Sequence, residues 1–179
     1  MRPLEKVLLH ICCGPCSTWS IEAIKQQYDP VLYWSDSNIW PLTEHDLRLE
    51  NAKKVAEFHK LDLIEDVYQH RDWLQAVAGF EKEPEGGARC TSCFAFSFKR
   101  SALKAAALKI SWFTTTLTIS PYKNNEVIHS AGRQAADEAG IRFLEMDFDD
   151  NGGYRRSISL SKEMNLYRQK YCGCEFSIR

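Results

Sequence analysis

The stretch that decides the fold reads KVLLHI over residues 6–11 and continues as CCGPCS over residues 12–17. Its first part is a short apolar run, which predicts a buried strand. Pro15 suits the first turn of a following helix, because proline lacks an N–H that a helix start leaves unpaired anyway. The sequence therefore predicts a strand that leads directly into a helix, with three cysteines at the junction.

Strand and helix patterns alternate along the rest of the chain. Further strands are predicted over residues 30–34, 61–67, 112–117 and 141–146, and helices over residues 20–27, 42–60, 72–80, 90–109, 125–139 and 161–170. This alternation favours an α/β fold with a doubly wound, mainly parallel five-stranded sheet of the Rossmann-like type. We expect one domain over residues 1–179, with its ligand site beyond the carboxyl ends of the strands.

The composition is that of an ordinary globular protein. Of 179 residues, 44% are apolar and 26% are charged, which argues against a disordered chain. Lys and Arg number 23 against 24 Asp and Glu, so the net charge of −1 confines any nucleic-acid surface to a local patch. The apolar run at residues 7–13 is too short to span a membrane and lacks a signal-peptide pattern. We expect a cytoplasmic protein with no membrane partner.

The seven cysteines fall into three clusters. They are Cys12, Cys13, Cys16, Cys90, Cys93, Cys172 and Cys174. Buried structural cysteines would be scattered singly, and an odd count in a cytoplasmic chain of this size argues against a disulfide framework. C-x-x-C pairs favour metal ligation by thiolates, but the spacing leaves zinc and iron–sulfur centres open.

The number of cysteines predicts two functions rather than one. A four-thiolate site leaves three thiols over, and the side chains of adjacent extended residues such as Cys12 and Cys13 point in opposite directions. The chain then holds either two metals, or one metal and a redox thiol. Cys16 is expected in the first turn of a helix, where the partial positive charge of the helix end favours the thiolate.

Other polar residues follow the predicted strands at the same edge. Asp36 and Asn38 follow the second strand. Ser120, Tyr122 and Lys123 follow the fourth, and Asp147 follows the fifth. We expect them near the cysteines, because the carboxyl ends of parallel strands share one edge. Candidate proton donors are Tyr122, Lys123, His10 and Asp147, although His10 lies in an apolar strand and is better explained as a core histidine.

Basic residues concentrate late in the chain. They are Arg155, Arg156, Lys162, Arg168, Lys170 and Arg179. The first two lie next to a glycine-containing loop at residues 151–154, which favours contact with phosphate. No glycine-rich dinucleotide motif or phosphate loop follows the first strand, so a nucleotide cofactor is not supported.

Four motifs carry a resemblance to a known family. They are LHICCGPCS at 9–17, EPEGGARCTSCF at 83–94, TTTLTISPYKN at 114–124 and YRQKYCGCEFS at 167–177. In this order they resemble the cobalamin-independent epoxyqueuosine reductases of the QueH family, from about residue 6 to residue 177. The resemblance implies that an epoxide on the cyclopentane ring of the wobble base of tRNA is deoxygenated to an alkene. It also implies a 4Fe-4S cluster and a second metal site.

The resemblance leads to an assignment of roles. Deoxygenation needs two electrons, two protons and a Lewis acid, whereas a 4Fe-4S cluster carries one electron at a time. We expect Cys90, Cys93, one of Cys12/Cys13 and one of Cys172/Cys174 to hold the cluster, and Cys16 with the remaining two to bind a second iron. Tyr122 or Asp147 would supply a proton. The expected partners are the tRNA and an unidentified electron donor, with substrate contacts from Asn38, Ser120, Lys123, Arg155, Arg156 and Arg168.

The chain departs from the family pattern at two places. The family usually has NPNI after the second strand, whereas residues 36–39 read DSNI. After the fifth strand it usually has DFRK, whereas residues 147–150 read DFDD. Asp149 and Asp150 would repel phosphate, so we expect Arg155 and Arg156 to make that contact instead.

Two other classes of protein fit parts of the sequence. A zinc-stabilised nucleic-acid-binding module accounts for the C-x-x-C pairs and the late basic residues, but not for the cysteines at 12, 13 and 16. A thiol–disulfide oxidoreductase uses one C-x-x-C pair and leaves the other five cysteines without a role.

Overall fold

The computed structural model, which describes residues 3–178, contains one sheet of five parallel strands. The strands are β1 (Glu5–Ile11), β2 (Tyr28–Trp34), β3 (Leu63–Glu65), β4 (Trp112–Thr115) and β5 (Arg142–Phe143), in the order β3-β2-β1-β4-β5. The predicted α/β fold with a parallel five-stranded sheet is therefore confirmed. None of the described helices is long and apolar enough to cross a membrane.

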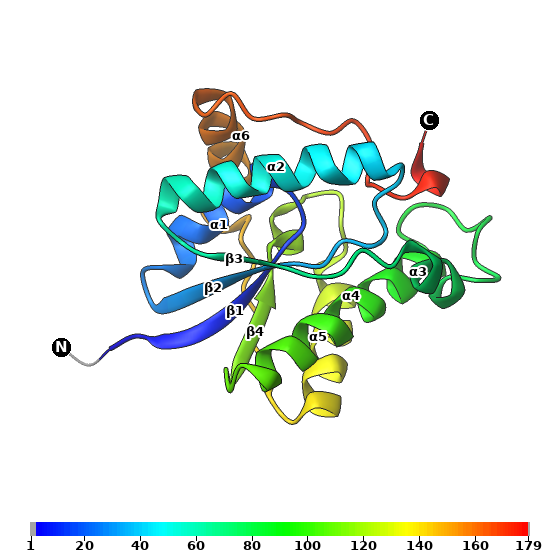
Figure 1. Ribbon diagram of the computed structural model, residues 1–179, viewed down its shortest axis with the longest axis horizontal. Helices are drawn as coiled ribbons and strands as arrows, with labels where there is room; N and C mark the ends of the chain where they lie inside the picture. The colour runs from blue at the N-terminus through cyan, green and yellow to red at the C-terminus, as the bar shows by residue number, and fades with distance from the viewer. Residues whose placement is uncertain (1–2, 179) are drawn as a thin grey trace.

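Helices cover both faces of the sheet (Figure 1). One layer contains α1 (Gly14–Ile24), α2 (Leu42–His59) and α6 (Gly153–Glu163), and the other contains α3 (His70–Ala76), α4 (Ala88–Ala107) and α5 (Asn125–Ala139). Strand β1 serves both layers because its side chains alternate. Val7 and Leu9 pack under the first layer and Leu8 under the second, and all three are fully buried.

The strand register brings the ends of the central strands to one level. Strand β1 pairs with β2 along its whole length, from Glu5 opposite Tyr28 to Ile11 opposite Trp34. Residues 12–16 and 35–39 therefore leave the sheet side by side. Strand β4 ends at the same edge and continues into the 3-10 helix η1 (Thr116–Ile119). This edge is where a doubly wound sheet binds its ligands.

The helix predicted over residues 161–170 is wrong, because α6 occupies Gly153–Glu163 instead. Asn151 and Gly152 both have positive φ, 57° and 83°, and turn the chain into the helix after the short 3-10 helix η2 (Asp150–Gly152). A Cβ on Gly153 would lie 1.8 Å from the carbonyl oxygen of Phe148, so only glycine fits there. The glycine pair was interpreted as a loop, whereas it is a close approach that starts a helix.

The segment after α6 crosses the carboxyl edge of the sheet without a regular helix or strand until the 3-10 helix η3 (Glu175–Ser177). Figure 1 shows this segment passing along α2 toward α3. Hydrogen bonds to other elements hold it: Asn51 Oδ1 accepts the Tyr167 N–H at 2.9 Å, and the Gly173 carbonyl accepts the Trp40 N–H at 2.9 Å. The fold thus carries Cys172 to a cavity at the end of β1, whereas Cys174 packs against Trp73 and Val77.

Candidate metal centre

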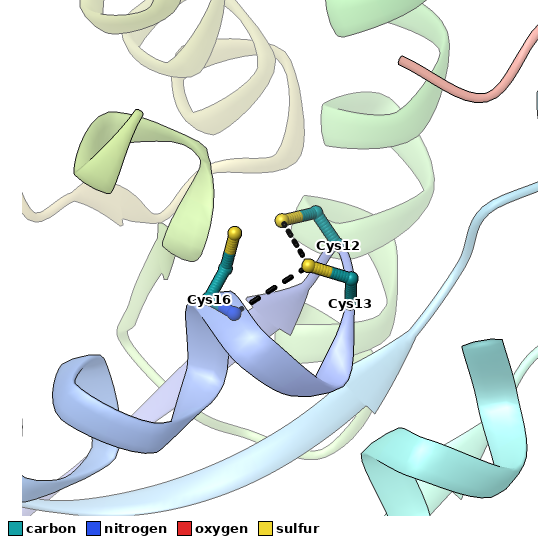
Figure 2. A group of neighbouring side chains, drawn as sticks. All are labelled: Cys12, Cys13 and Cys16. Carbon is teal, nitrogen blue, oxygen red and sulfur yellow. Dashed lines mark hydrogen bonds between the residues drawn. The ribbon is translucent and has the colours of Figure 1, made fainter. Parts of the chain in front are cut away.

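Three cysteine sulfurs converge at the end of β1 (Figure 2). The Sγ atoms of Cys12, Cys13 and Cys16 all lie within 4.8 Å of one another, and across residues 3–178 no second group of three His, Cys, Asp or Glu side chains gathers in this way. Cys13 is the extended N-cap of α1, and its sulfur accepts the Cys16 N–H at 3.5 Å. The helix start therefore turns the adjacent Cys12 and Cys13 toward a common point.

Side chains from distant elements fix these thiols. The hydroxyl of Thr116, in η1, accepts the Cys12 N–H at 3.1 Å and lies 3.2 Å from its Sγ. The amide of Gln169, in the segment after α6, donates to the Cys13 sulfur at 3.2 Å. The start of α1 thus positions the three thiols of Cys12, Cys13 and Cys16, which we call the triad. The 3-10 helix η1 and the segment after α6 hold them in place.

The triad favours one thiolate, and further thiolates would need a positive charge beside them. Hydrogen bonds from the Cys12 and Cys16 thiols, with the Cys16 N–H and the Gln169 amide, hold the pKa of Cys13 well below its usual value. The pKa of Cys12 is raised because its thiol donates to Cys13, and burial adds to this effect. These directions favour one thiolate, at Cys13, beside two thiols. A bound cation would stabilise all three thiolates, so this donor set fits a thiophilic metal ion.

The other four cysteines form a second group. Cys90 and Cys93 lie in the first turns of α4, and Cys172 and Cys174 lie in the C-terminal segment. The Lys123 ammonium donates to Cys172 Sγ at 3.3 Å. Burial raises the pKa of Cys93, and the nearby sulfurs of Cys172, Cys174 and Cys90 raise it further. These four thiols come from two segments and interact electrostatically through Cys93, and their number is that of a four-thiolate cluster site.

One cavity of about 630 Å³ joins the two groups. Cys12 and Cys16 from the triad and Cys93 and Cys172 from the second group line it. Five further predicted site residues also line it, namely Asn38, Ser120, Tyr122, Lys123 and Arg168. Its volume suits a ligand of nucleoside size, because small-molecule sites occupy roughly 300–1,000 Å³.

Of the eight predicted site residues other than cysteine, the structure places three away from the cavity lining. Asp147 lies 3.1 Å from His129 Nε2 and accepts the Asn125 amide at 2.9 Å, both from the first half of α5. Arg155 lines a separate hollow beside Tyr154, and the Arg156 guanidinium lies 4.4 Å from the Trp19 ring centroid. The proposal of Asp147 as a proton donor therefore gains no support from this geometry.

His10 is a buried residue of β1, as expected. Its Nδ1 lies 2.9 Å from the Thr115 hydroxyl, and burial lowers its pKa from 6.5 to about 4. Its Nε2 lies 3.7 Å from Asp36 Oδ1, and burial raises the pKa of Asp36 well above its usual value. Asp36 Oδ2 is buried without a hydrogen-bond partner, and Asp36 lines the cavity.

Arg48 is a cavity residue that the sequence did not reveal. It lies within α2, which reads as a polar helix, yet it is only 2% exposed. Gln169 was also missed, whereas Asp36 was expected at this edge because it follows the second predicted strand. No pattern in the sequence distinguishes Arg48 from the charged residues on the outer face of the same helix.

Comparison with known proteins agrees with this geometry. The family model described as Epoxyqueuosine reductase QueH matches residues 7–179. Epoxyqueuosine reductase QueH of Streptococcus pyogenes serotype M1 is 37% identical over an alignment of 185 positions. The alignment covers all of this chain and 72% of the relative. The same-named proteins of Acinetobacter baylyi and Thermotoga maritima are 37% and 35% identical. The aligned regions cover 98% and 96% of this chain, and 81% and 90% of those relatives.

Two solved structures share the fold at low sequence identity. One is the predicted subunit of tRNA methyltransferase from Methanocaldococcus jannaschii, with a TM-score of 0.59, 15% identity, and coverage of 89% of this chain and 75% of that one. The other is the U34-tRNA thiolase NcsA from Methanococcus maripaludis with its 4Fe-4S cluster, with a TM-score of 0.60, 12% identity, and coverage of 99% and 63%. Because the family model matches residues 7–179 and named members align over nearly all of this chain, the chain belongs to the QueH family of epoxyqueuosine reductases.

Proposed function

We propose that this protein reduces the epoxide of epoxyqueuosine at the wobble position of tRNA, forming the alkene of queuosine. The observation that carries the proposal is the cavity at the carboxyl edge of the sheet, which thiols from three separate segments line in a member of this family. The reaction consumes two electrons and two protons and releases the epoxide oxygen as water. The proposal treats residues 1–179 as one metalloreductase domain acting in the cytoplasm.

The thiols support two metal sites, a 4Fe-4S cluster and a second, mononuclear iron. The sequence-based division separated Cys12 from Cys13, whereas the geometry favours keeping Cys12, Cys13 and Cys16 together. Three sulfurs within 4.8 Å of one another suit a single ion, because thiolates at about 2.3 Å from a tetrahedral metal lie about 4 Å apart. Cys90, Cys93, Cys172 and Cys174 would then hold the cluster.

When bound, the cluster supplies single electrons and the second iron acts as a Lewis acid toward the epoxide oxygen. The chain's own residues bind the substrate and supply protons. Asn38 and Ser120 offer an amide and a hydroxyl to the polar groups of the modified base. The buried Lys123 ammonium lines the cavity, where it favours negative charge.

Tyr122 is the proposed proton donor. It lines the cavity and is 83% exposed, so its hydroxyl is free to meet a substrate that enters from solvent. Lys123 is a further proton-bearing group of the cavity. Asp147, outside the cavity lining, is not assigned a role in the reaction.

Local basic residues, not net charge, support the tRNA contact. Arg168 lines the cavity and Arg155 lines the neighbouring hollow. The acidic Asp149 borders the same hollow as Arg155, so contact with phosphate there depends on the arginine. An electron donor of unassigned identity completes the set of partners.

Anaerobic purification tests the proposal. The protein should be brown, hold about five irons per chain, and convert epoxyqueuosine-tRNA to queuosine-tRNA when supplied with dithionite. Colourless protein that holds only zinc after reconstitution, and gives no product, would contradict the proposal. The zinc-stabilised nucleic-acid-binding module would then be favoured.

A further inference from the structure

The guanidinium of Arg48 holds the backbone of the C-terminal segment at Tyr171 and Cys172. Its Nη1 donates to the carbonyl oxygen of Cys172 at 2.9 Å, and its Nη2 donates to that of Tyr171 at 3.2 Å. The Tyr171 ring lies 5.0 Å from the guanidinium carbon. These contacts join residues separated by 124 and 123 positions in the sequence.

Arg48 is itself held in place. Its Nε donates to Glu44 Oε1 at 2.7 Å, one turn earlier on α2. The same carboxylate accepts the Tyr167 hydroxyl, at 3.0 Å and 3.1 Å to its two oxygens. Glu44 therefore connects the guanidinium to a second point of the C-terminal segment, and the arrangement leaves Arg48 one orientation.

We propose that Arg48 is a positioning residue, which sets the backbone of residues 171–172 and thereby places the thiols of Cys172 and Cys174 for metal binding. The segment from residue 164 to residue 174 has no helix or strand to fix it. The two hydrogen bonds from the planar guanidinium fix this backbone, as the hydrogen bonds between strands fix the backbone of a sheet. The roles of the two thiols as ligands rest on the proposed function, but the clamp itself does not.

Packing at Gly173 shows how closely the clamp fits. This residue has a φ of +148°, and a Cβ there would lie 3.3 Å from Arg48 Nη1 and 3.2 Å from Asn38 Nδ2. The backbone between the two cysteines thus passes directly against the guanidinium. A lysine cannot replace the arginine, because one ammonium cannot make the planar two-pronged contact to adjacent carbonyls.

The chain offers a matched control in Arg100. It lies on α4 with a side chain about one-fifth exposed, where its Nε donates to Asp66 at 2.6 Å and its Nη2 donates to the Val67 carbonyl at 3.0 Å. Arg100 thus pins a different loop, away from the cavity. Replacing either arginine by methionine removes a similar set of contacts and a similar stem.

The experiment uses full-length metal-free protein and measures the iodoacetamide alkylation rate of each cysteine by mass spectrometry. In Arg48→Met, Cys172 and Cys174 should react at least about tenfold faster, because the loss of the charged hydrogen bonds to the Tyr171 and Cys172 carbonyls frees the segment. Cys12, Cys13 and Cys16 should change by less than about twofold. Arg48→Lys should resemble Arg48→Met, and Arg100→Met should leave all seven rates near wild type.

A second measurement separates positioning from loss of stability. After anaerobic reconstitution, the electron paramagnetic resonance spectrum of reduced Arg48→Met should differ from wild type, whereas that of Arg100→Met should not, even where both lose similar thermal stability. If Arg48→Met does not fold, Glu44→Gln is tested in its place. It should also speed the alkylation of Cys172 and Cys174 and alter the spectrum, but by smaller amounts. Unchanged alkylation of Cys172 and Cys174 in the folded variants overturns the proposal. A wild-type protein without reductase activity overturns the proposed function but leaves the alkylation result standing.

Discussion

The two groups of cysteines are built in different ways. Cys12, Cys13 and Cys16 come from five consecutive residues, and the end of β1 and the first turn of α1 bring their sulfurs within 4.8 Å. The second group combines the start of α4 with a C-terminal segment that has no regular structure of its own there. The first site is thus a product of secondary structure, whereas the second depends on long-range polar contacts. Mutations should therefore damage them differently.

The largest expected effect is in the first group. Cys13→Ser removes the sulfur but keeps an N-cap, because serine is a favourable capping residue. We expect turnover to fall at least about 10³-fold and iron bound by the triad to be lost, with the melting temperature nearly unchanged. Iron analysis, an epoxyqueuosine-tRNA assay and calorimetry check this. Full iron content with full turnover would show that Cys13 is not a ligand.

The cavity between the two groups supplies the next test. Tyr122→Phe keeps the ring and removes the hydroxyl, so kcat should fall about 10²-fold or more if Tyr122 donates a proton. Asp147→Asn is the control, since Asp147 does not line the cavity, and it should keep kcat within about twofold. A single-turnover assay under reducing conditions measures both. Equal losses in the two variants would contradict the assignment.

The second group should be more sensitive to backbone changes. Gly173→Ala introduces a Cβ at a positive φ and against Arg48 and Asn38, so we expect a loss of about 2–4 kcal/mol in the free energy of unfolding. Gly79→Ala is the control, because Gly79 also has a positive φ, of +88°, but open space around it, and it should lose only about 1 kcal/mol. Urea denaturation gives both values. Similar losses would mean that packing against Arg48 contributes little.

The smallest expected effect concerns the strand that carries the first group. Burial lowers the pKa of His10 from 6.5 to about 4, so the folded protein keeps this ring neutral after the unfolded chain has taken up a proton. This contribution to stability is intact above about pH 6.5 and declines as the pH falls toward 4. Between pH 7 and pH 5 this effect of His10 should lower the free energy of unfolding by about 2 kcal/mol.

Urea denaturation of metal-free wild type and His10→Gln at both pH values checks the last prediction. The variant should lose less stability than wild type on acidification, because glutamine takes up no proton while the carboxylates are common to both proteins. Identical pH dependence in the two would show that His10 is not kept neutral by burial.

Elements governed by local pattern were predictable from the sequence. The strand at residues 6–11, the helix after it and the position of Cys16 in its first turn follow from apolar runs and a proline, and the structure confirms them. The helix over 161–170 was wrong because Gly153 is needed for a close approach to Phe148, which only the folded chain reveals. The clustering of site residues at the sheet edge was also predictable, because parallel strands share their carboxyl edge.

The sequence by itself determined the order of strands and helices, the number of thiols and the membership of the family, since these depend on neighbouring residues and on motifs. Only the tertiary structure decided which thiols stand together, that Asp147 pairs with His129 outside the cavity lining, and that Arg48 faces the C-terminal segment. The physical reason is range. Helix capping and strand periodicity act over a few residues, whereas the guanidinium of Arg48 and the carbonyl of Cys172 meet across 124 positions, which no local pattern records.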